Sequence, residues 1–180
     1  MMQKLFRVQR ILIVAYIATA LLAFIYALAF MTEYQNLFGL RLPLNKAVSE
    51  FHDQALQSFN RSILAWALGG VGFIALAFFL EAFSTVPDRF ALVLLLASLA
   101  AVAFGAVSSL ARIPALEETY RGLDTTFLEM EGLRGYQLNF LPFTLGRIVY
   151  LLQTVSCVCL GCALTASHLC FLRQKKGVRA

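Results

Sequence analysis

Four long apolar stretches dominate the pattern of hydrophobic and polar residues along this chain. They cover residues 11–31, 62–83, 90–110 and 148–172, and none has a charged residue in its central turns. A helix needs about 20 mostly apolar residues to cross the roughly 30 Å hydrocarbon core of a bilayer. The first stretch exceeds the 7–15 residue core of a cleaved signal peptide, so we expect it to be retained. The pattern predicts an all-α integral membrane protein.

We expect a single membrane domain over residues 1–180, a four-transmembrane-helix bundle made of two hairpins. Residues 32–61 and 111–147 form the two longer loops. In the first loop, apolar residues after Pro43 recur at steps of three and four, the period of one helix face. No Gly or Pro interrupts the chain from 44 to 68. This predicts one continuous helix from about 45 to 83 that projects beyond the membrane.

The second loop predicts another amphipathic helix. Pro114 suits the first turn of a new helix, and the acidic residues Glu117 and Glu118 would lie favourably near its N-terminus. Apolar residues then follow a 4-3-4-3 spacing, which is typical of a helix-packing seam. The two apolar faces can pack on each other, dock a separate protein or lie on lipid. The candidate outer partner-binding seam comprises Val48, Phe51, Phe59, Leu116, Tyr120, Leu123, Phe127 and Met130.

The distribution of charge predicts the orientation of the chain. The two ends and the short link between spans two and three hold eight Lys/Arg against two acids, whereas the two longer loops hold seven against eight. Cytoplasmic segments carry the excess of Lys and Arg, so both termini are expected in the cytoplasm and both amphipathic helices outside. We therefore expect a multi-pass protein of the cell membrane. The net charge of +5 follows this topology and gives no reason to expect a nucleic-acid partner.

Polar residues within the spans concentrate on the fourth one. Gln153, Thr154 and Ser156 lie close together there, and Arg147 and Tyr150 precede them towards the outer end. These five are the candidates for a pocket or a partner contact. No ionisable carboxylate or amine lies at mid-depth of any span, although ion-coupled transport usually needs one.

The four cysteines also lie in the fourth span. Cys159 and Cys162 form a C-x-x-C pair and are candidate redox thiols, but neither outer loop has a cysteine to relay electrons to a soluble partner. The chain has no G-x-S-x-G, P-loop or G-x-G-x-x-G motif. The sequence therefore predicts no catalytic residues, no cofactor and no metal site, and it favours a non-enzymatic role without deciding the point.

The leading interpretation is a non-enzymatic subunit or accessory factor of a larger membrane complex, plausibly one for transport. Its expected partners are the lipid bilayer and either other membrane proteins or further copies of itself. Two alternatives stay open. One is a homo-oligomeric channel or small-molecule pore lined by Gln153, Thr154 and Ser156, and the other is a membrane-embedded thiol or quinone oxidoreductase that uses Cys159 and Cys162.

Overall fold

The computed structural model describes residues 2–31, 46, 50–123 and 139–177 of the 180-residue chain, and over these it is helical apart from short turns. The elements are α1 (Met2–Met31), the π-helical turn η2 (Phe51–Leu56), α3 (Gln57–Phe79), α4 (Arg89–Arg121) and α6 (Leu141–Gly177). Four of these helices are long and apolar enough to cross a membrane, which confirms the prediction of four apolar helical segments.

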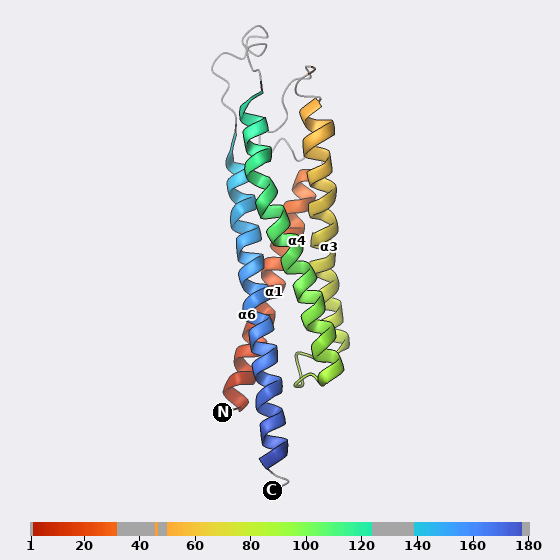
Figure 1. The fold of residues 1–180 in the computed structure, drawn as a ribbon, viewed down its shortest axis with the longest axis vertical. Helices are drawn as coiled ribbons and strands as arrows, with labels where there is room; N and C mark the ends of the chain where they lie inside the picture. Colours follow the sequence, from red (N-terminus) through yellow and green to blue (C-terminus); the bar gives the residue numbers. More distant parts are fainter. Residues whose placement is uncertain (1, 32–45, 47–49, 124–138, 178–180) are drawn as a thin grey trace.

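The four long helices lie side by side and alternate in direction (Figure 1). The four helices form a ring of neighbours, because α1 and α4 each contact both α3 and α6. The start of α1, the end of α6 and the α3–α4 link, residues 80–88, share one end of the molecule. We call this the terminal end and the other the opposite end. The arrangement is compatible with a helical bundle.

Two clusters of buried side chains fill the interior, one towards each end. Tyr16, Phe73, Leu95 and Leu160 belong to the terminal-end cluster. Aromatic residues dominate the opposite-end cluster, which includes Tyr26, Phe59, Tyr120, Phe143 and Tyr150. The outward faces are apolar as well, with exposed residues such as Ile11, Phe79, Phe104 and Val158. A helix that is apolar all round suits a surrounding of lipid rather than water.

Helix α3 ends at Phe79, so the prediction that it continues to residue 83 is wrong. Glu81 adopts a left-handed backbone conformation with φ of 52°. The Glu81 N–H donates to the Phe78 carbonyl at 3.0 Å and the Ala82 N–H to the Ala77 carbonyl at 2.9 Å. This pair of bonds is the Schellman motif, which usually has glycine at the left-handed position. Because Glu81 and not glycine occupies this position, the sequence contains no glycine that would predict the end of α3.

Pro114 does not begin a new helix, because it lies inside α4. The N-terminus of α4 is instead at Asp88, whose Oδ1 accepts a hydrogen bond from the Ala91 N–H at 2.7 Å. Glu117 and Glu118 consequently lie near the C-terminal end of a helix rather than near an N-terminus. The proline ring has no N–H to donate, and the apolar packing of Ile113 and Leu116 on either side holds this stretch helical.

Gly105 allows α3 and α4 to approach closely, because an added methyl group there would overlap the Trp66 ring. Overpacking a buried site costs about 1–3 kcal/mol. We therefore expect Gly105→Ala to lower the melting temperature of the purified protein by several degrees. Gly72→Ala is the matched control, since nothing lies within 4 Å of a methyl group at Gly72. Equal melting temperatures for the two variants would contradict this packing.

Candidate functional site

The polar residues predicted on the fourth span point into the molecule from α6. Gln153 and Tyr150 are each only 3% exposed. The Ser156 hydroxyl lies 2.8 Å from the Thr19 hydroxyl of α1 and so links the two helices. The Thr154 hydroxyl donates to the Tyr150 carbonyl of its own helix at 2.8 Å. Four of the five candidates therefore lie together, whereas Arg147 lies at the opposite end.

The space beside Gln153 is very small. A cavity of about 10 Å³ is lined by residues of all four long helices, namely Ala23, Trp66, Ala67, Val102, Ala106, Tyr150 and Gln153. The Gln153 Oε1 and Tyr150 Oη atoms have no hydrogen-bond partner in the part of the chain that the structure describes. A cavity of this size holds about one water, and a buried water needs polar partners of this kind. The site fits a single water and is too small for an organic ligand.

Glu117 connects α4 with α6 at the opposite end. Its carboxylate accepts hydrogen bonds from Arg147 at 2.5 Å and from Arg121 at 3.2 Å, and its side chain is only 15% exposed. Nearby, the Tyr26 hydroxyl donates to the Pro142 carbonyl at 2.9 Å. Arg147 therefore has a structural partner within the chain.

We expect Glu117→Gln to destabilise the protein by about 1 kcal/mol, because it removes the charge that both arginines share. High salt should reduce the difference from the wild type, since ions screen charge pairs that are partly exposed. Glu118→Gln is the matched control, because the neighbouring Glu118 is exposed and forms no ion pair with any residue that the structure describes. Thermal unfolding at two salt concentrations measures this. Equal destabilisation by the two variants would contradict the assigned role of Glu117.

The described part of the outer seam is covered by this chain itself. Phe51, Phe59, Leu116 and Tyr120 are all buried in the opposite-end cluster, and the Phe51 and Tyr120 rings lie 5.7 Å apart. Leu123 packs against the same cluster. In this described part, the two apolar faces therefore pack against each other. Val48, Phe127 and Met130 lie outside the described residues.

The four cysteines are all free thiols. Cys157 is buried, whereas Cys159 and Cys162 are exposed on the outward face of α6. No disulfide joins this pair, and nothing in the structure tests its redox role. Among the described residues, no group of three His, Cys, Asp or Glu side chains could hold a metal ion.

A groove lies between α4 and α6 on the described surface, and sequence reasoning missed it. Its volume is about 520 Å³. Its lining combines small residues, longer apolar side chains and thiols, of which Leu99 and Cys157 are buried: Leu96, Leu99, Ala100, Ala103, Cys157, Val158, Gly161, Cys162, Thr165, Ala166 and Leu169. We call it the α4–α6 groove. The small residues on α4 and α6 were the available signal, but the sequence alone does not show that they face each other.

No protein-family model, curated protein or solved structure matches this chain. The proposals below therefore rest on the geometry and chemistry of the chain's own residues.

Proposed function

We propose that this chain is a non-enzymatic subunit of a larger membrane complex and that a transmembrane helix of a partner protein packs into the α4–α6 groove. The groove itself is the observation that carries the proposal. Small residues at a helix surface let a second backbone approach closely, and transmembrane helices associate through such contacts. Gly161 is one of these small residues and faces α4, where a methyl group added to it would lie 3.6 Å from Leu96 and 4.0 Å from Leu99.

The length and polarity of the groove suit a helix. Its α6 side runs from Cys157 to Leu169, which at 1.5 Å per residue is about 18 Å, or about three turns. The hydroxyl of Thr165 donates to the Gly161 carbonyl at 2.8 Å, so it needs no partner from a ligand. The groove therefore offers apolar packing over several turns rather than a polar recognition site.

The interior gives no support for chemistry on a bound substrate. The cavity beside Gln153 and Tyr150 has room for about one water. A pore through a single chain would need a continuous path, whereas Tyr16, Leu95 and Leu160 fill the interior towards the terminal end. A channel would therefore have to form between copies of the chain.

We further propose that the terminal end faces the cytoplasm of a cell-membrane protein. The described residues there include Lys4, Arg7, Arg10, Arg89, Arg173 and Lys175 against Glu81 and Asp88. This excess of positive charge follows the bias of cytoplasmic segments. The turn η2, the start of α3 and the end of α4 then form the extracytoplasmic extension.

Labelling of single cysteines tests this orientation. In a variant whose four native cysteines are replaced, we expect Gln54→Cys to react with a membrane-impermeant maleimide on intact cells. Ser84→Cys should react only after the membrane is permeabilised. Both positions are exposed in the structure, so the side of the membrane on which each lies decides whether the maleimide reaches it. The reverse pattern would invert the orientation.

Gly161→Leu tests the groove. The leucine side chain would fill the groove. We expect native mass spectrometry after gentle extraction to show about tenfold less bound partner protein, because an overpacking cost of about 1.4 kcal/mol weakens binding by that factor. Gly69→Leu is the matched control, because Gly69 is exposed on α3 with nothing within 4 Å of an added methyl group.

The same experiment separates the alternatives. A wild-type complex with a different membrane protein, lost in Gly161→Leu and kept in Gly69→Leu, supports the proposal. A pure homo-oligomer would overturn it in favour of the channel, which flux through liposomes would then measure. A complex that both variants retain equally would place the partner elsewhere and contradict the groove.

A further inference from the structure

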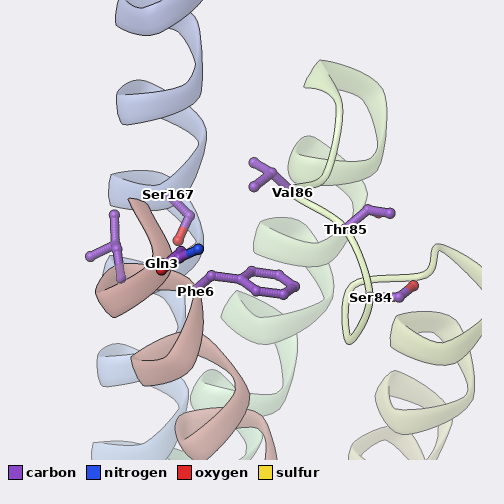
Figure 2. A pocket seen from close by; sticks show the side chains of 7 residues that line it. Gln3, Phe6, Ser84, Thr85, Val86 and Ser167 are labelled. Carbon is purple, nitrogen blue, oxygen red and sulfur yellow. The ribbon is translucent and has the colours of Figure 1, made fainter. Parts of the chain in front are cut away.

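A second hollow lies at the terminal end, away from the α4–α6 groove. It has a volume of about 200 Å³ and lies between the start of α1, the α3–α4 link and α6 (Figure 2). We call it the terminal-end pocket. Its lining combines apolar and uncharged polar side chains: Gln3, Leu5, Phe6, Ser84, Thr85, Val86 and Ser167.

Three side chains hold the wall of this pocket in place through backbone carbonyls of the α3–α4 link. From α1, the Gln9 Nε2 donates to the carbonyl of residue 82 at 2.8 Å and the Arg10 Nε to that of residue 83 at 3.0 Å. From α6, the His168 Nδ1 lies 2.8 Å from the carbonyl of residue 87. The link cannot move freely against α1 and α6, so the pocket is preformed.

Ser167 is the unusual residue of the pocket. It is 3% exposed, and its Oγ has no hydrogen-bond partner among the described residues. Several serine and threonine hydroxyls in these helices are satisfied by their own backbone, as Ser109 is by the Gly105 carbonyl at 2.7 Å. In Figure 2 the Ser167 oxygen is directed towards the Gln3 side chain. A buried hydroxyl without a partner is unfavourable, and a ligand that accepts a hydrogen bond from it would relieve this.

The first turn of α1 forms another side of the pocket. Helix α1 begins at Met2, is 30 residues long and has no acidic residue in its first turn. The first N–H groups of a helix have no partner within it, and they lie at the positive end of the helix dipole. Such an end binds phosphate or carboxylate groups. The exposed side chains of Lys4 and Arg7 add positive charge beside it.

We propose that the terminal-end pocket binds the phosphate group of an anionic phospholipid. The first-turn N–H groups of α1, the Gln3 amide and the Ser167 hydroxyl donate to the phosphate oxygens. The acyl chains leave along the apolar side chains of Phe6 and Val86, whose presence favours a lipid over free phosphate. Phe6 is itself fixed by the Arg10 guanidinium, which lies 4.4 Å from its ring centroid.

Basic residues at the cytoplasmic ends of transmembrane helices attract anionic lipids in general. Here the pocket adds a defined position for one headgroup. The inference needs the chain to span a membrane, but it does not need a partner in the α4–α6 groove. The two proposals can therefore fail separately.

Lipid retention in native mass spectrometry tests the pocket. Purified protein in neutral detergent is mixed with phosphatidylglycerol, with phosphatidylcholine or with inorganic phosphate. We expect the wild type to retain phosphatidylglycerol preferentially, and Ser167→Ala combined with Gln3→Leu to retain about tenfold less, because hydrogen bonds to an ionised group are strong. Ser109→Ala, a buried serine that is already satisfied, is the matched control and should retain as much as the wild type.

Thermal unfolding shows whether the variants remain folded. Without lipid, the double variant should melt close to the wild type, because the Ser167 hydroxyl has no partner to lose and Gln3 is exposed. Phosphatidylglycerol should then raise the melting temperature of the wild type and not that of the variant. A double variant that unfolds without lipid would contradict the absence of a structural role for these side chains.

Three outcomes would overturn the proposal. Equal retention of phosphatidylglycerol by the wild type and the double variant would show that the pocket does not hold the lipid. Equal retention of phosphatidylcholine by the wild type would show that the negative charge of the headgroup is not recognised. Stabilisation by inorganic phosphate as large as that by the lipid would identify a site for the free anion instead.

Discussion

Backbone hydrogen bonding in apolar surroundings is the constraint on which the rest of this structure depends. In hydrocarbon each N–H and C=O group needs a partner inside the protein, and a helix satisfies them within a single segment. The same constraint explains the hydroxyls of Ser98, Ser109 and Thr165, which donate to carbonyls of their own helices. What remains for contact between helices is close packing and a few polar links, such as the Tyr16 hydroxyl on the Gly70 carbonyl at 3.1 Å.

The ion pairs and the polar contacts between elements described above lie mainly near the helix ends, where backbone and side-chain polar groups need not all be paired within one helix. At the opposite end, Glu117 and Arg147 join α4 to α6 next to a cluster of aromatic rings. At the terminal end, side chains of α1 and α6 hold the α3–α4 link and leave a pocket whose Ser167 hydroxyl has no hydrogen-bond partner among the described residues. Between the two ends, the interior is nearly closed and the outward faces are apolar. The proposed partner helix and the proposed lipid consequently occupy different parts of the surface.

Several errors of sequence-based prediction share one cause, which is that local signals were outweighed by their neighbours. Pro114 lies within a helix because apolar packing on both sides holds it there, although proline usually marks a helix start or break. Helix α3 ends at Phe79, and the turn that follows has Glu81 at the left-handed position where glycine is usual. The π-helical turn at Phe51–Leu56 has no sequence signal that periodicity can detect.

The amino-acid sequence is enough to predict the four apolar helices, because hydropathy over about 20 residues is a property of composition and does not depend on which helices pack together. It also singled out Gln153, Tyr150 and Ser156 as candidates for a pocket or a partner contact, and the structure shows that all three are buried. Only the tertiary structure decided that the space beside Gln153 is about the size of one water, and that Phe51 meets Tyr120. It alone brought Gln3 and Ser167, 164 positions apart, into one pocket. Such juxtapositions depend on how the helices rotate and shift against one another, and that is set by side-chain packing across the whole interior.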